Sequence, residues 1–216
     1  MAWLPQLFDM LLHLDATLGQ VIADYGTWVY AILFLIIFCE TGLVVLPFLP
    51  GDSLLFVAGA FAATGALSLP WLLALLCLAA IVGNTVNYAV GSYLGPRVFQ
   101  WPDSAFFNRA ALDRAHRFYE QHGGKTLVIT RFMPILRTFT PFVAGISAMN
   151  ISRFQCFNIA GALLWVISLT LAGYLFGNVP FVKNNLTLVI LVIIALSLLP
   201  AVIAWWKSRG AHANVD

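Results

Sequence analysis

Residues 131–145 read RFMPILRTFTPFVAG and place two arginines six positions apart among prolines, aromatic residues and aliphatic residues. Each proline of this stretch, Pro134 and Pro141, removes a backbone hydrogen-bond donor and kinks or ends a helix. The sequence therefore predicts two half-helices around an irregular centre, which at membrane depth must face protein or water. An arginine inside a bilayer costs about 2.5 to 3.5 kcal/mol on insertion scales. Arg131 and Arg137 together therefore predict a candidate anion site.

An earlier stretch has the same organisation with charges of the opposite sign. Residues 40–59 read ETGLVVLPFLPGDSLLFVAG, so Glu40 and Asp52 take the place of the arginines and prolines again break the helix. The tetrapeptide FVAG ends both stretches, at 56–59 and 142–145. We interpret the pair as a diverged internal repeat, an organisation common among transporters. The residues predicted to shape the two hairpins are Pro47, Pro50, Gly51, Pro134, Pro141 and Gly145.

The composition is that of an integral membrane protein. Of 216 residues, 61% are hydrophobic and only 9% are charged, and the mean hydropathy is +0.90. A water-soluble globular domain of this length would not show these values. The net charge of +2 gives no indication of a nucleic-acid partner. Cys39, Cys77 and Cys156 lie in apolar stretches without metal-ligand spacing, so no metal or cofactor is expected.

Runs of apolar residues predict the membrane spans. A bilayer core of about 30 Å needs about 20 apolar residues in a helix. Segments of this length are found at 27–46, 70–94, 154–177 and 186–206. The two Pro-broken segments, 47–66 and 126–149, are interpreted as re-entrant helical hairpins. The remaining segments are an amphipathic interfacial helix at 1–26, a polar loop with a surface helix at 97–125 and a tail at 207–216.

The N-terminal segment is expected to be retained in the mature protein. Its first 24 residues contain no Lys or Arg, so they lack the basic region of a secretory signal.

The distribution of basic residues decides between two topologies. If both Pro-broken segments crossed the bilayer, six spans would place the basic loop at 97–125 opposite the basic tail, against the positive-inside rule. With both segments re-entrant, four spans place that loop, Arg153 and the tail on one side and leave Lys183 on the other. The sequence therefore predicts four spans with both termini in the cytoplasm. The two hairpins then enter from opposite sides, which is the inverted-repeat layout of a secondary transporter.

Six stretches that follow one another along nearly the whole chain carry a family resemblance. They are FCETGLVVLPFLPGDSLLFVAGA (38–60), NYAVG (87–91), HGGKT (122–126), RFMPILRTFTPFVAG (131–145), NIAGALLW (158–165) and AGYLFG (172–177). Together they resemble the DedA family of bacterial inner-membrane proteins, whose membrane domain is shared with eukaryotic lipid scramblases. The resemblance implies a single membrane domain over residues 1–210, with two opposed re-entrant hairpins between transmembrane helices.

The same resemblance implies a range of membrane functions. For the family these extend from stress tolerance that depends on the proton-motive force to the recycling of undecaprenyl phosphate, the lipid carrier of cell-wall synthesis. By their positions in the matched stretches, Glu40 and Asp52 resemble the functional acids of the family, and Arg131 and Arg137 resemble its functional arginines. One departure is Asn84, where family members commonly have aspartate. This difference removes one candidate proton carrier.

The four intramembrane charges allow a functional and a structural interpretation. The planar fork of arginine suits a phosphate, so Arg131 and Arg137 are interpreted as the residues that bind the phosphate of a lipid substrate. Ionisable groups at membrane depth are usually functional, so Glu40 and Asp52 are interpreted as the proton-coupling residues. The alternative is that the arginines only neutralise the acids in a buried ion-pair network.

Two asparagines complete the set of candidate site residues. Asn84 and Asn87 lie three positions apart in the predicted span 70–94, and they either line a central cavity or form hydrogen bonds between helices. The opposed hairpins also predict that Glu40 and Arg137 lie in one central cavity.

These features favour a transporter over an enzyme. The sequence predicts a flippase that moves undecaprenyl phosphate across the bacterial inner membrane for recycling, coupled to the proton-motive force. Its partners would be this lipid phosphate, protons and membrane lipids. The alternatives are a proton-coupled ion transporter that supports membrane homeostasis and a lipid phosphatase. Against the phosphatase, neither Pro-broken segment contains a histidine that could serve as its nucleophile.

Overall fold

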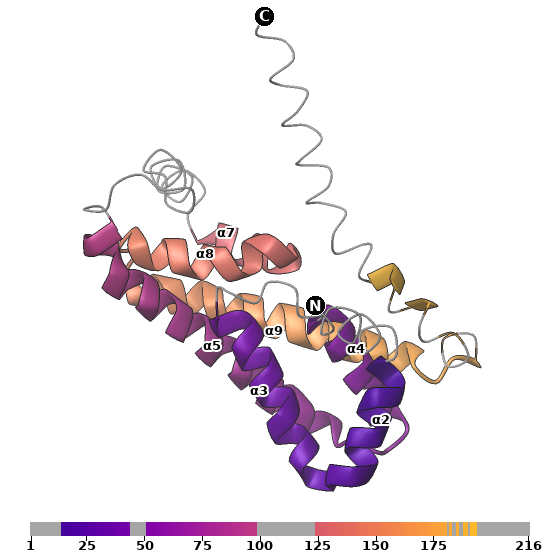
Figure 1. Ribbon diagram of the computed structural model, residues 1–216. Coiled ribbons are helices and arrows are strands. Elements are labelled where there is room, and N and C mark those ends of the chain that lie inside the picture. Colours follow the sequence, from indigo (N-terminus) through magenta and orange to yellow (C-terminus); the bar gives the residue numbers. More distant parts are fainter. Residues whose placement is uncertain are drawn as a thin grey trace, which may run out of the picture. The chain divides into compact units, whose positions relative to one another are not determined.

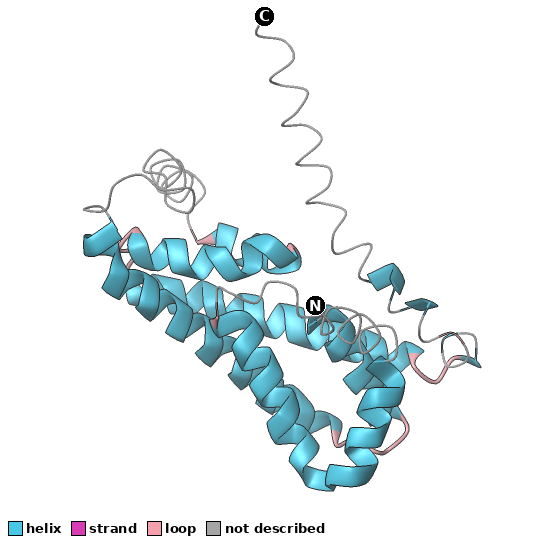
Figure 2. Ribbon diagram, viewed as in Figure 1, coloured by secondary structure: helices cyan, strands magenta, loops and turns pink. Residues whose placement is uncertain are grey.

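The computed structural model describes residues 14–43, 51–98 and 124–180 and a few positions between 182 and 193. Every regular element in this part of the chain is a helix (Figures 1 and 2). In chain order the elements are α2 (Leu14–Tyr25), η1 (Gly26–Trp28), α3 (Val29–Gly42), α4 (Gly51–Ala63), α5 (Leu69–Val98), α7 (Lys125–Ile129), η2 (Thr130–Phe132), α8 (Pro134–Ile146) and α9 (Ile151–Phe176). The all-helical class predicted from the sequence is confirmed for the described residues.

Helices α5 and α9 are long and apolar enough to cross a membrane. Their qualifying parts are Leu69–Gly95, with 27 residues, and Ile151–Phe176, with 26 residues. At about 1.5 Å per residue, each helix exceeds the roughly 30 Å of hydrocarbon in a bilayer. They lie where apolar runs at 70–94 and 154–177 predicted membrane spans. Helix α5 continues to Val98, slightly beyond the predicted beginning of the polar loop.

The long helix α5 exposes apolar side chains and buries polar ones. Its asparagines Asn84 and Asn87 are buried, with 3% and 0% of their surface exposed. Apolar residues that recur every fourth position remain 37% to 51% exposed, namely Leu78, Val82, Val86 and Val90. Such an arrangement suits a helix whose outer side contacts lipid, because lipid accepts apolar side chains and buried polar groups need partners inside the protein.

The first Pro-broken segment contains one short helix in its described part. Helix α3 ends at Gly42, before the predicted end at 46, and α4 begins at Gly51, while Pro47 and Pro50 lie outside the described residues. Helix α4 has 13 residues, a length of about 20 Å, so it is too short to cross a bilayer. A turn follows, in which Gly65 has a φ of +82°. The re-entrant path of this segment stays a prediction.

The second Pro-broken segment is interrupted where Pro134 begins α8. The preceding residue, Met133, has φ −116° and ψ 106°, the extended conformation expected before proline. The predicted interruption is found at Met133, between α7 and η2 on one side and α8 on the other, but the chain from Pro134 to Ile146 is one continuous helix. Pro141 was also predicted to kink or end a helix, and it does not end one. Pro141 lies inside α8, which continues for five more residues to Ile146.

A donor outside α8 reaches the turn of the helix that precedes the internal proline. The backbone oxygen of Thr138, three positions before Pro141, accepts a hydrogen bond from Nδ2 of Asn87 in α5 at 2.8 Å. Neighbouring helices commonly satisfy backbone groups near a proline in membrane helices in this way.

Other predictions fall mainly outside the described residues. Helix α2 is the described part of the predicted N-terminal helix at 1–26. Most of the loop at 97–125, most of the span at 186–206 and all of the tail at 207–216 belong to the part of the chain that is not described.

The described chain divides into two compact units, and each is described by itself. In its described residues, the first unit comprises 14–31, 51–72 and the positions from 168 onward. The second unit comprises 32–43, 73–98 and 124–167.

In the first unit, short helix α4 interlocks with long helix α9 through glycines. A Cβ added at Gly173 would overlap the backbone oxygen of Phe56, and one added at Gly59 would overlap the backbone oxygen of Thr170. A Cβ added at Gly177 would overlap the Cβ of Ala60. The FVAG tetrapeptide of α4 therefore packs directly on the GxxxG motif of α9.

The second unit repeats this contact between short helix α8 and long helix α5, which lie beside each other in Figure 1. A Cβ added at Gly91 would overlap the backbone oxygen of Phe142, and one added at Gly145 would overlap the backbone oxygen of Tyr88. Each FVAG tetrapeptide therefore meets a GxxxG motif in the same register, which supports the interpretation of an internal repeat. Gly145 permits this close packing from inside α8, and its predicted role in shaping a hairpin stays a prediction.

Candidate functional site

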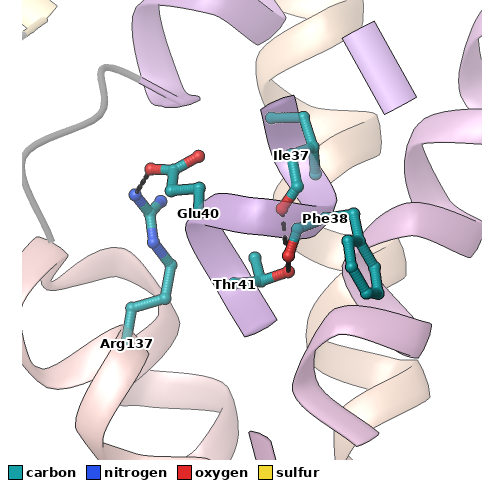
Figure 3. A network of polar contacts seen from close by, with 5 residues as sticks. All are labelled: Ile37, Phe38, Glu40, Thr41 and Arg137. Atoms are coloured by element: carbon teal, nitrogen blue, oxygen red, sulfur yellow. Dashed lines mark hydrogen bonds and ion pairs between the residues drawn. The ribbon is translucent and has the colours of Figure 1, made fainter. Parts of the chain in front are cut away.

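An ion pair joins one predicted acid to one predicted arginine in the second unit. Nη2 of Arg137, on α8, donates to Oε1 of Glu40, near the end of α3 (Figure 3). Both residues are buried, with 3% and 0% of their surface exposed. The two residues are therefore in direct contact, which also fits the structural alternative of a neutralised pair, and the central cavity predicted around them stays a prediction.

Asn87 of α5 holds the backbone on both sides of this ion pair. Its Nδ2 donates to the backbone oxygens of Thr41 at 3.1 Å and Thr138 at 2.8 Å. Each of these residues directly follows a member of the pair. One amide group therefore ties α3 and α8 to α5, so of the two roles predicted for Asn87 the structure shows hydrogen bonding between helices.

Close approach of α3 and α5 accompanies these hydrogen bonds. A Cβ added at Gly83 of α5 would overlap the hydroxyl of Thr41. That hydroxyl donates to the backbone oxygen of Ile37 at 2.8 Å, within α3 (Figure 3). The absence of a side chain at Gly83 therefore lets the end of α3, which carries Glu40, lie directly on α5.

Arg131 is buried in a different environment, made of neutral oxygens. It lies in η2 and is 1% exposed. Its Nη1 donates to O and Oδ1 of Asn158 at 3.2 and 3.1 Å, and its Nη2 donates to the backbone oxygen of Ala80 at 3.1 Å. Within the described part of the chain, no carboxylate lies within 4.0 Å of this guanidinium. Arg131 is thus hydrogen-bonded to neutral oxygens and has no direct carboxylate partner among the described residues.

Trp165 of α9 contacts both arginines. Its ring centroid lies 4.6 Å from Cζ of Arg137 and 5.7 Å from Cζ of Arg131, and the side chain is fully buried. Both distances lie within the range in which a cation is attracted to an aromatic face. One indole ring therefore brings the two predicted phosphate-binding residues to the same place.

Asn84 belongs to the hydrogen-bond network of Arg131. Its Nδ2 donates to Oδ1 of Asn158 at 3.1 Å, the same oxygen that accepts from Arg131. Because arginine only donates, this atom of Asn158 must be the oxygen, and the nitrogen of Asn84 must face it. Here again the structure shows the hydrogen bonding between helices that was one of the two predicted roles.

Two residues of this site were missed by the sequence reasoning. Asn158 and Trp165 lie in the stretch NIAGALLW, which was singled out only for its family resemblance. A signal was present, because they are seven positions apart on one face of a predicted membrane helix, with Gly161 between them. A polar residue on such a helix needs a buried partner.

Asp52, the second predicted proton-coupling residue, lies in the first unit. It occupies the first turn of α4 and is half-buried. Its relation to the other candidate residues stays a prediction.

The charges of the described and buried side chains of the second unit do not cancel. Among its described and buried side chains, Arg131 and Arg137 are cationic and only Glu40 is anionic. Burying an uncompensated charge in a low-dielectric environment is costly. The arrangement therefore suits the binding of an anion.

These observations define an all-helical protein with apolar spans and a buried cationic site, and the comparisons assign its family. The chain belongs to the DedA family, because residues 49–175 match the family model described as the VTT domain. It is 55% identical over 210 residues to Protein DedA of Escherichia coli strain K12, and the match covers 96% of both chains.

More distant relatives support the same assignment. The chain is 44% identical over 179 residues to an uncharacterized membrane protein of Mycobacterium leprae, covering 83% of this chain and 80% of the relative. It is 38% identical over 191 residues to Inner membrane protein YqjA of Escherichia coli, covering 83% and 85%. No solved structure matches the chain significantly. The names of these relatives and the two apolar helices show that the chain is a membrane protein.

Proposed function

We propose that this protein is a transporter that moves a polyprenyl phosphate, with undecaprenyl phosphate as the candidate substrate, between the leaflets of a bacterial inner membrane. The observation that carries the proposal is the state of Arg131, a buried guanidinium that no described carboxylate neutralises. A phosphate that passes through hydrocarbon needs a counter-charge, and arginine provides one together with two parallel donors. Arg131 and Arg137, held by one indole ring, would serve that purpose together.

The ion pair suggests how protons would be coupled to this movement. In the structure, the carboxylate of Glu40 forms an ion pair with the guanidinium of Arg137. A phosphate and this carboxylate would compete for the same donors, so a proton on Glu40 would release Arg137 for the substrate. The membrane potential supplies about 2.3 kcal/mol per charge and per 100 mV for such a step. We assign Asp52 a second proton-carrying role.

The function is tested by leaflet exchange of a labelled polyprenyl phosphate in liposomes that contain the purified protein. Arg131→Ala and Arg137→Ala should each lower the rate on the order of 50-fold or more, because the cost of the uncompensated phosphate is at least about 2.5 kcal/mol. Arg→Lys changes should impair the rate less, since they keep the charge but lose the fork. Arg153→Ala is the matched control, because Arg153 is exposed at the beginning of α9.

The same liposomes separate the competing functions. Glu40→Gln and Asp52→Asn should abolish the dependence of exchange on pH or potential and leave slow, uncoupled exchange. Normal exchange by both Arg→Ala variants would refute the phosphate-site assignment. A pH change tied to ion movement without lipid exchange would indicate an ion transporter, and release of inorganic phosphate would indicate a phosphatase.

We also propose that both termini face the cytoplasm. In a chain whose three native cysteines are replaced, cysteines introduced at Asp103, Ser152 and His212 should react only with a probe on the cytoplasmic side, and one at Asn184 only from outside. Labelling at position 103 by an impermeant probe outside the cell would instead support six spans.

A further inference from the structure

Arg131 has more N–H donors than it has hydrogen bonds to the described residues. A guanidinium has five N–H donors, and Arg131 makes three hydrogen bonds, two from Nη1 and one from Nη2. Its Nε has no acceptor among the described residues, although the side chain is 1% exposed. The Nε–H and an Nη2–H lie side by side on one edge of the guanidinium. Buried donors without acceptors are costly, so the Nε–H on this edge needs an acceptor that the described chain does not supply.

One face of α9 holds the opposite edge of the same guanidinium. Asn158, Gly161 and Trp165 are spaced at i, i+3 and i+7, so they lie on one side of the helix. Asn158 accepts both hydrogen bonds from Nη1, and Trp165 lies against the guanidinium. A Cβ at Gly161 would lie 3.4 Å from Cδ of Arg131, so the small residue leaves room for the arginine stem. All three residues are neutral, so they orient the charge without cancelling it.

We infer that Asn158 is a positioning residue, which holds Arg131 so that its Nε/Nη2 edge binds the phosphate of the substrate. Two parallel N–H groups match two phosphate oxygens, the bidentate geometry that arginine commonly uses. Arg131 then makes the first contact with the phosphate, since Arg137 already has the carboxylate of Glu40 against it. This inference rests on the proposed function. It adds Asn158 to the site, and it states that the phosphate contacts Arg131 before Arg137.

The neutrality of Asn158 gives a sharp test. An Asn158→Asp substitution keeps an oxygen acceptor at the same place but supplies the negative charge that the phosphate would otherwise bring. If Arg131 and Asn158 were only structural, a charge-assisted hydrogen bond between them would strengthen the local contact and leave phosphate binding unchanged. If Asn158 positions an un-neutralised arginine, the same substitution must weaken phosphate binding.

The experiment measures binding of farnesyl phosphate to the purified full-length protein in detergent by calorimetry, with farnesol as the uncharged comparison. The wild type should bind farnesyl phosphate more tightly than farnesol. Asn158→Asp should weaken farnesyl phosphate binding at least tenfold and leave farnesol binding unchanged. Asn150→Asp is the matched control, because Asn150 caps the exposed beginning of α9 through Oδ1, which an aspartate retains. This control should bind both lipids as the wild type does.

A second variant covers the case in which Asn158→Asp does not fold. Asn158→Ala removes the Oδ1 acceptor and leaves the backbone oxygen, so it should weaken farnesyl phosphate binding a few-fold. Unchanged binding in the folded Asn158 variants would overturn the inference and leave the proposed function standing. A wild type that binds farnesyl phosphate no better than farnesol would overturn both. Normal phosphate binding without leaflet exchange would overturn only the proposed transport.

Discussion

Replacing Glu40 with alanine should lower the free energy of unfolding by about 3 to 5 kcal/mol, because the change removes the carboxylate that lies against the buried guanidinium of Arg137. The loss should be visible as a lower melting temperature of the purified protein in detergent.

A double substitution provides the control. Replacing a complete buried ion pair with apolar residues is often neutral, so Glu40→Met combined with Arg137→Met should recover most of the stability lost in Glu40→Ala. If the double variant were as unstable as the sum of its single variants, the pair would not act as a unit. The double variant should still be inactive in leaflet exchange, because it lacks a phosphate-binding residue.

The second large effect is expected at the repeated glycine contact. Gly173→Ala and Gly91→Ala should each destabilise the protein by about 1 to 3 kcal/mol or more, because the added methyl group meets a backbone oxygen that cannot rotate away. Gly19→Ala is the matched control, since its nearest neighbour would be the side chain of Phe61 at 3.4 Å, an ordinary contact. Melting in detergent measures all three.

The two glycines should also give similar losses, because their contacts correspond residue by residue. A large loss at Gly173 with none at Gly91 would contradict that equivalence.

The elements that could be predicted from the sequence depend on local chemistry. Length and hydropathy were sufficient for α5 and α9, and Pro134 was sufficient for the break at Met133, since proline restricts the residue before it. Pro141 could not be interpreted correctly in the same way. A proline can kink or end a helix, and no local rule indicates that α8 continues past this one to Ile146.

In the candidate site too, the residues that could be predicted are those with a local signal in the sequence. Glu40, Arg131 and Arg137 could be predicted because a charge in an apolar segment is unusual by itself. The pairing of Arg137 with Glu40, and the neutral surroundings of Arg131, depend on which helices are neighbours. Asn158 and Trp165 resemble ordinary packing residues until their contacts are known.

The repeated glycine contact has a consequence for biosynthesis. The helix on which α4 packs through Gly59 is α9, whose Gly173 is synthesised more than a hundred residues later. Helix α8, by contrast, follows its partner α5 along the chain and can pack as soon as it leaves the ribosome. Insertion would therefore complete the second unit first. Helix α4 would remain without its packing partner until α9 has been synthesised.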